Sequence, residues 1–201
     1  MKFLKAAAAA LAATTVAVPA ANAAVIGIET DETTVQAGEI FDVRILFEAE
    51  TETEILSAYL LDIFFDDDAL AFAGVSFIDP ETNVNQVDFP WAPAYVSEFF
   101  ADAIPGEVEL FGITGNENDF LLENQADDFV VATLSFLAYR NSDSAMIVLD
   151  TLLSELSGNN LEPLNPVFGQ TELNIEVVPL PGAALFMLTG LAGLVARKRL
   201  G

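Results

Sequence analysis

Apolar and polar residues alternate along most of the sequence, and this period of two constrains the fold more than any other feature. Side chains of a β-strand point to opposite faces in turn, so Phe41, Val43, Ile45 and Phe47 share one face. Segments of this kind lie at residues 41–47, 59–65, 70–75, 107–114, 130–138, 146–153 and 173–177. Several short strands, without convincing helical periodicity, predict an all-β fold, an antiparallel β-sandwich.

Turn residues separate these segments. Residues 36–39 form a turn before the first of them, and Asp66, Asp67 and Asp68 follow the second. Residues 79–103 contain three prolines, one tryptophan and the pair Phe99-Phe100. This composition predicts a long loop with at most one helical turn.

The sequence contains no cysteine and no histidine. A domain made from it must therefore be stable without disulfides. The usual Ser-His-Asp and Cys-His catalytic groups are excluded, and so are zinc and most transition-metal sites. Any metal bound here would be a hard cation on oxygen ligands, and calcium fits best.

The central region is strongly acidic. All 31 acidic residues lie between Glu29 and Glu176, whereas Arg44 and Arg140 are its only basic residues, which gives a formal charge of −29. Such a surface repels nucleic acid and anionic lipid and attracts cations. It also destabilises its own compact state unless salt screens the charges.

The N-terminus has the pattern of a secretory signal peptide. Lys2 and Lys5 precede an apolar run over residues 6–18, and Ala21-Asn22-Ala23 is a small-x-small cleavage site. This order predicts a signal helix over residues 1–23, cleavage by signal peptidase, and a mature chain that begins at Ala24.

The C-terminus combines a proline motif, an apolar run and a basic tail. The motif is Val178-Pro179-Leu180-Pro181, residues 182–196 carry no charge, and Arg197-Lys198-Arg199 follow. The prolines keep the chain extended, and the basic triplet would stay on the cytoplasmic side of a membrane. The run is shorter than the lower limit of about 17 residues for a membrane-spanning helix, and counting from Val177 to Ala196 makes the span marginal. Residues 178–201 therefore predict a transient anchor.

These C-terminal residues resemble the PEP-CTERM class of bacterial sorting signals, in the VPLPA-type variant whose motif reads Val-Pro-Leu-Pro. The resemblance implies export and processing by an exosortase-type membrane transpeptidase. It also implies a final place at the surface or in the extracellular matrix of a Gram-negative bacterium. An ordinary C-terminal membrane anchor is the alternative.

Residues 24–177 resemble a cohesin-like domain. The resemblance rests on three features: a turn at Gly38 before a strand; residues 61–66 (Leu-Asp-Ile-Phe-Phe-Asp) followed by Leu70-Ala71-Phe72; and residues 132–136 (Ala-Thr-Leu-Ser-Phe). The Asp-Pro often found at that acidic turn is Asp66-Asp67 here. The family implies a jelly-roll sandwich that binds a dockerin-type module or a carbohydrate-linked assembly.

Two oxygen-rich segments are candidate calcium sites. Asp66, Asp67 and Asp68 could supply several carboxylates from one turn, and Asn116 with Asp119 could do so from a second loop. The second segment lacks the spacing of an EF-hand loop. The alternative is that both are solvated turns that end strands.

The sequence favours a non-enzymatic protein that binds a partner such as an exopolysaccharide or another surface protein. The alternative is a carbohydrate-binding or glycoside-cleaving module in which Trp91 and Tyr95 stack on sugar rings. Glycoside cleavage needs one pair of carboxyl groups, but no spacing among the acidic residues singles out such a pair. Those aromatic side chains could equally fill one end of the sandwich.

Overall fold

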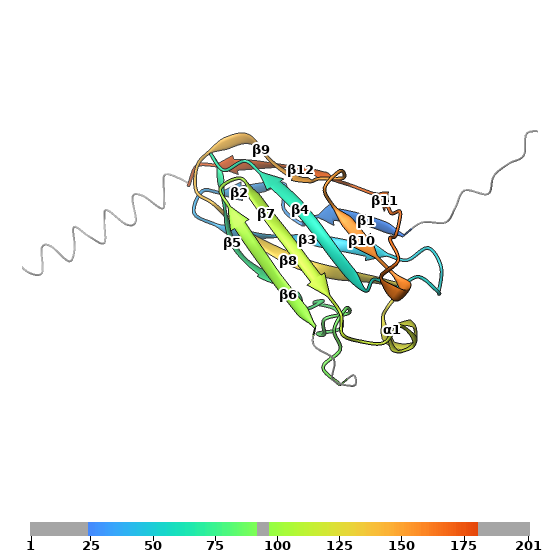
Figure 1. Cartoon of the computed structure of the whole chain (residues 1–201). Coiled ribbons are helices and arrows are strands. Elements are labelled where there is room, and N and C mark those ends of the chain that lie inside the picture. Colours follow the sequence, from blue (N-terminus) through green and yellow to red (C-terminus); the bar gives the residue numbers. More distant parts are fainter. Residues whose placement is uncertain (1–23, 92–96, 181–201) are drawn as a thin grey trace, which may run out of the picture.

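A computed structural model describes residues 24–91 and 97–180, and two β-sheets pack face to face in this part of the chain (Figure 1). Sheet I has the order β11-β1-β3-β8-β5, and sheet II has the order β2-β12-β9-β4-β7-β6 with β10 paired to β4. The strands of sheet I are β1 (Val25–Glu29), β3 (Ile40–Glu48), β5 (Leu70–Ser76), β8 (Asp128–Ala138) and β11 (Val167–Phe168). Those of sheet II are β2 (Thr34–Gln36), β4 (Ala58–Phe65), β6 (Glu98–Ile104), β7 (Glu107–Ile113), β9 (Ser142–Leu149), β10 (Glu155–Ser157) and β12 (Glu172–Val178).

The predicted antiparallel β-sandwich is confirmed, with one addition. The long neighbouring strands pair antiparallel, as in β3–β8, β4–β7 and β9–β12. Two short pairs, β1–β11 and β2–β12, are parallel. The added pairs extend each sheet by one short strand at its edge.

The core lies between the sheets and is made by the alternating apolar residues. Phe136 of β8 is fully buried at its centre. Its ring lies 6.0 Å from that of Phe41, 5.3 Å from Phe65 and 6.1 Å from Phe72, between ring centroids. Aromatic packing of this kind adds to the free energy gained from burial. The period of two seen in the sequence therefore has its cause in this shared interior.

A bulge in β8 corrects the predicted face of Val130. The register places Ala132 beside Ile45 but Val130 beside Leu46, so Val131 is the extra residue. Val131 is part of the core, whereas Val130 lies on the outer side with Leu46. A bulge shifts alternation by one residue, which a pattern read along one strand does not reveal.

Two predicted boundaries are wrong, and two short helical elements were not predicted. Residues 98–104 form β6 rather than the end of a long loop. The ninth strand ends at Leu149, since Asp150 Oδ1 accepts the N–H groups of Leu152 and Leu153 in a turn. The short helix α1 (Asn118–Asn124) was not expected, and a 3₁₀ turn, η1 (Asn159–Leu161), follows β10.

A second, small core closes one end of the sandwich. It consists of Ile55, Phe89 and Leu121, with Val84 and Phe120 packed against it. The helix α1, which contributes Leu121, lies below the sheets in Figure 1. This small core is thus built from the segment before β4, the loop after β5 and α1.

The predicted terminal elements lie mostly outside the described residues. The first strand begins at Val25, directly after the buried Ala24, and the last ends at Val178. The signal helix at residues 1–23 and the apolar run at 182–196 with Arg197, Lys198 and Arg199 fall beyond the described ranges. No helix within residues 24–91 and 97–180 is long and apolar enough to cross a membrane.

Candidate binding face

The outer face of sheet II carries rows of apolar and acidic side chains that cross three strands. Phe100 and Phe111 stack with ring centroids 5.0 Å apart and planes 24° apart, and Phe100 is 46% exposed. Stacked rings open to solvent on a sheet face are a common feature of binding surfaces. The rows across β4, β7 and β6 are Leu60, Phe111 and Phe100; Asp62, Glu109 and Asp102; and Phe64, Glu107 and Ile104. We call the second of these the acidic row.

Asp62 is the innermost member of the acidic row. It is only 6% exposed, and its N–H group donates to Ser154 Oγ at 3.3 Å. Burial raises the pKa of the Asp62 carboxyl, and the nearby charge of Asp150 raises it further. The ion pairs of the two described arginines, Arg44 and Arg140, lie elsewhere. The row therefore concentrates negative charge that no described cation of the chain offsets.

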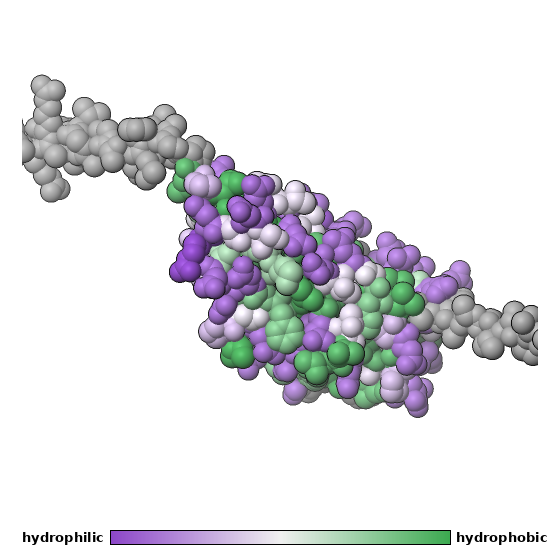
Figure 2. Space-filling model, turned by 90° about the horizontal axis from the view of Figure 1, so that it is seen from above, coloured by the Kyte–Doolittle hydropathy of each residue, from purple (hydrophilic) through white to green (hydrophobic). Residues whose placement is uncertain are grey.

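Hydrophobic side chains are also exposed elsewhere on the molecule. Figure 2 shows hydrophobic patches lying between hydrophilic groups on the side seen from above Figure 1. Exposed large apolar residues outside the three rows include Met146 of β9 and Ile40 of β3. The surface is thus a mixture of acidic and apolar groups rather than a uniformly charged shell.

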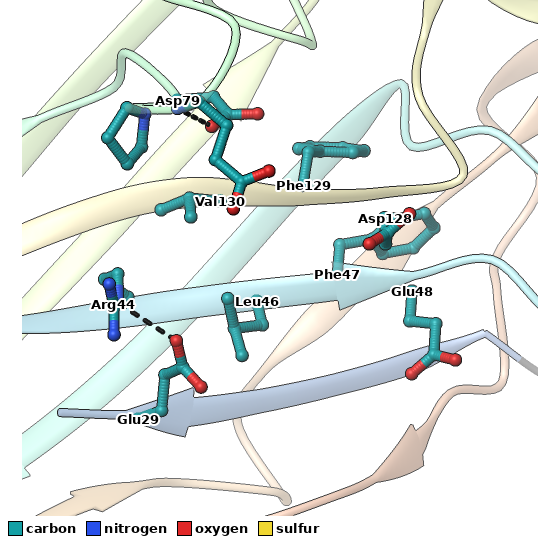
Figure 3. A pocket seen from close by; sticks show the side chains of 11 residues that line it. Glu29, Arg44, Leu46, Phe47, Glu48, Asp79, Asp128, Phe129 and Val130 are labelled. Atoms are coloured by element: carbon teal, nitrogen blue, oxygen red, sulfur yellow. Dashed lines mark hydrogen bonds and ion pairs between the residues drawn. The ribbon is translucent and has the colours of Figure 1, made fainter. Parts of the chain in front are cut away.

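A hollow of about 320 Å³ opens on the outer face of sheet I (Figure 3). Leu46 and Val130 contribute its apolar side, and Arg44 lies along one wall. Arg44 Nε lies 2.9 Å from a Glu29 carboxylate oxygen, and Arg44 Nη2 lies 2.8 Å from Asp31 Oδ1. The acidic residues around the hollow are Glu29, Glu48, Asp79, Glu81 and Asp128.

The contacts around this hollow hold the chain together. Asp79 Oδ1 accepts the N–H of Glu81 at 2.8 Å and shapes the loop after β5. Arg44 ties the end of β1 to β3 through its two ion pairs. These contacts account for Arg44, Glu29 and Asp79 without a ligand. On sheet II no described cation pairs with the acidic row, so we take sheet II as the stronger candidate for a binding face.

The two predicted calcium segments lie at opposite ends of β4. Asp66, Asp67 and Asp68 follow the strand, whereas Asn116 lies near its start, because the Thr114 N–H donates to Ser57 O at 2.9 Å. Asp119 lies in α1. The structure thus keeps the two segments apart.

Within the first segment the side chains make local contacts. Asp66 Oδ1 accepts the Asp68 N–H at 3.0 Å, and Asp68 Oδ1 lies 3.4 Å from Arg140. The Tyr139 hydroxyl donates to Asp67 O. In the part of the chain that the structure describes, no three acidic side chains are grouped as a metal site requires. Calcium binding at this turn stays a prediction.

The predicted sugar-stacking residues are only partly described. Trp91 is 59% exposed, and its ring centroid lies 5.3 Å from that of the buried Phe89. Phe89 belongs to the small end core, while Trp91 covers it from outside. Tyr95 lies outside the described residues.

The sequence pattern did not single out the acidic row. Asp62, Glu109 and Asp102 come from three strands, and only the register of β4, β7 and β6 brings them together. The available signal was the alternation itself, since Asp62 and Glu109 stand at polar positions within otherwise apolar strands. Pairing partners cannot be chosen from such a pattern.

No protein-family model matches the sequence, and no curated protein matches it. Solved structures do resemble the fold. A type II cohesin domain from the cellulosome of Acetivibrio cellulolyticus superposes with a TM-score of 0.59 at 16% identity, covering 76% of this chain and 95% of that one. The non-cellulosomal cohesin of Archaeoglobus fulgidus superposes with a TM-score of 0.52 at 10% identity, covering 82% of this chain and 97% of that one.

A third similar structure was solved with its partner. The sixth cohesin of scaffoldin B from A. cellulolyticus, in complex with a Cel5 dockerin variant, gives a TM-score of 0.54 at 13% identity. The superposition covers 77% of this chain and 99% of that one. These likenesses confirm the predicted fold, a cohesin-like β-sandwich.

Proposed function

We propose that the protein is a non-enzymatic binding module that holds a protein partner against the outer face of sheet II. The observation that carries this proposal is the acidic row flanked by the exposed Phe100 and the half-buried Phe111 and Phe64. A buried carboxylate such as Asp62, with further acids in the same row, favours a partner that supplies lysine or arginine. The flanking rings would contribute the apolar part of the contact.

The fold likeness supports the same class of function. One similar structure is a cohesin in complex with a dockerin, which is a protein partner. By analogy, this chain would display its sandwich for assembly with another surface protein. The flat, mixed apolar and acidic face fits a protein better than a small molecule.

To test this, the full-length protein is immobilised and used to capture binding partners from the extracellular proteins of the source bacterium. The Phe111→Ser variant removes an aromatic ring from the centre of the face, and Ile40→Ser removes an exposed side chain from sheet I as the matched control. We expect one partner, identified by mass spectrometry, to be captured by the wild type and the control but not by Phe111→Ser. Equal capture by all three would contradict the proposed face.

The place of action is part of the proposal. We propose that residues 1–23 direct export and that Val178-Pro179-Leu180-Pro181 is cut by an exosortase-type transpeptidase while residues 182–196 hold the chain in the membrane. The protein would then remain at the cell surface or in the extracellular matrix. Mass spectrometry of the extracellular form should find neither residues 1–23 nor Arg197, Lys198 and Arg199. A product that keeps the basic tail would mean that the C-terminal segment is an ordinary membrane anchor and is not cut.

Carbohydrate binding is the second candidate, and the exposed indole of Trp91 is the observation that favours it. A glycan array measured with the wild type and with Trp91→Ala decides between the two. Binding that depends on Trp91 but not on Phe111 would favour an exopolysaccharide as the ligand.

A further inference from the structure

The strand β6 is the open edge of sheet II. In the described residues it pairs with β7 alone, through an unbroken register from Glu98 beside Ile113 to Ile104 beside Glu107. Its charged residues are Glu98 and Asp102, and it contains neither lysine nor proline. Lysine, proline and bulges are common protection for edge strands, and β6 has none of these, so only its two acidic side chains oppose the addition of another strand.

Two hydrogen bonds between β4 and β7 show which residues of β6 have their N–H and C=O groups on its open side. The Phe65 N–H donates to Gly106 O at 2.9 Å, and the Thr114 N–H donates to Ser57 O at 2.9 Å. Even-numbered residues of β7 therefore face β4, and its odd-numbered residues face β6. In the register of β6 with β7, this leaves the N–H and C=O groups of Phe99, Ala101 and Ala103 on the open side.

An apolar hollow lies beside this edge, where β6 meets β5, the outermost strand of sheet I. Its volume is about 390 Å³, and Phe72, Ala103 and Ile104 are among the residues that line it. Ile104 is 58% exposed. A strand added to β6 would place the side chain beside Ala103 over this hollow, because neighbouring residues of paired strands share a face.

The same addition would extend the rows of the outer face by one position. The residue next to Asp102 would continue the acidic row, where a lysine or arginine offsets its charge. The residues next to Phe100 and Ile104 would continue apolar positions. The edge thus prescribes an apolar residue, a cation and an apolar residue at alternate positions of the added strand.

We infer that β6 is a docking edge for an extended segment of a partner protein, which pairs with it as an additional strand and places lysine or arginine beside Asp102. This inference rests on the proposed function, because it names the partner's chemistry at the edge of the same face. Main-chain bonds to Phe99, Ala101 and Ala103 supply affinity, and the alternate side chains supply specificity.

A second copy of this chain fits the edge less well. Antiparallel pairing of two β6 strands about Ala101 would place Asp102 beside Phe100 and would supply no cation. Each copy also carries a formal charge of −29 between Glu29 and Glu176, which opposes association. Charge complementarity therefore selects a cationic partner.

The test uses a blocked synthetic peptide, Thr-Val-Thr-Lys-Thr-Val-Thr, titrated into the full-length protein and followed by NMR. We expect the amide signals of Phe99, Ala101 and Ala103 to shift and to become protected from hydrogen exchange. The same peptide with glutamate in place of lysine should bind about tenfold more weakly. Equal binding of the two peptides would overturn the inference.

Two variants locate the contact. Ala101→Pro removes a donor on the open side while leaving the bonds to β7, and Ala101→Val is its matched control. Peptide binding should be lost in the proline variant alone. Asp102→Lys should reverse the preference in favour of the glutamate peptide, which keeps the test valid if Ala101→Pro does not fold.

The outcomes separate this inference from the proposed function. If Ala101→Pro folds and binds the peptide like the wild type, strand addition is wrong, whereas capture of the native partner by the face still depends on Phe111. Self-association that Ala101→Pro abolishes, without peptide binding, would assign the edge to a second copy and would also overturn the inference.

Discussion

Tyr59 is an inward-facing residue of β4 whose hydroxyl oxygen is buried without a hydrogen-bond partner among the described residues. Its ring lies against Gly112, where any added Cβ would overlap it. A buried hydroxyl that makes no hydrogen bond keeps its full desolvation cost. We therefore expect Tyr59→Phe to raise the free energy of unfolding by about 1 kcal/mol, measured by urea denaturation.

Tyr139 provides the control for this prediction. Its hydroxyl donates to Asp67 O, so Tyr139→Phe should lower stability or leave it unchanged. Burial raises the pKa of Tyr59 above its ordinary value, so the folded state disfavours ionisation of this group. The wild type should consequently lose stability as the pH rises beyond about 10, and Tyr59→Phe should lose less.

Asp62 makes the stability of the folded protein depend on pH in the acidic range. Its pKa is raised in the folded state by burial and by Asp150, so the folded protein binds more protons than the unfolded chain just above the ordinary aspartate value of about 3.9. Stability should therefore fall as the pH rises through this window towards neutral. We expect Asp62→Asn to melt higher than the wild type at neutral pH and to gain less on acidification.

The matched control for Asp62 is Asp143→Asn, an exposed acid on β9. It removes the same formal charge from the surface, so it reports the general relief of charge repulsion. If both variants raise the melting temperature equally at neutral pH, the special position of Asp62 is refuted.

At the scale of elements, β8 shows how one strand divides its side chains between core and surface. Phe136 is fully buried among three other phenylalanine rings, whereas Thr133 pairs with Arg44 on the outer side. We expect Phe136→Ala to cost about 3–5 kcal/mol of unfolding free energy and Thr133→Ala to cost about 0.5 kcal/mol. Comparable losses in chemical denaturation would mean that the faces of β8 are assigned wrongly.

At the scale of the whole molecule, the charge of −29 opposes folding. Raising salt from about 0.01 M to about 1 M shortens the Debye length from about 30 Å to about 3 Å, which screens surface repulsion. The melting temperature in NaCl should rise across this range, as followed by circular dichroism. A flat profile would show that repulsion contributes little.

Calcium adds a second arm to the salt experiment. At matched ionic strength, calcium should stabilise the protein beyond sodium only if the turn at Asp66, Asp67 and Asp68 chelates it. The double variant Asp66→Asn with Asp68→Asn should then lose the calcium increment and keep the response to NaCl. Identical melting temperatures in the two salts would mean that the turn does not bind calcium and only ends the strand.

The sequence predicted the long strands because their inward residues alternate cleanly, as in Phe41–Phe47 and Tyr59–Phe65. It did not predict β1, β2, β10 or β11, because segments of two to five residues carry little or no period. It missed β6 because Phe99 packs on the core while Phe100 lies on the outer face, which hides the alternation. The bulge at Val131 places Val130 on the outer face of sheet I, where it is still buried, and the sequence could not show this because the extra residue is defined by the partner strand.

The β-sandwich class, the inward residues of the main strands, the acidic character of the surface and the absence of cysteine and histidine chemistry all follow from the order of the amino acids. These properties depend on composition and on a period of two, which are local. The pairing and register of the strands, and so the acids and aromatic rings that share a face, could be known only from the folded chain. The acidic row and the open edge at β6 arise from contacts between residues far apart in the chain, and their register depends on how the whole core packs.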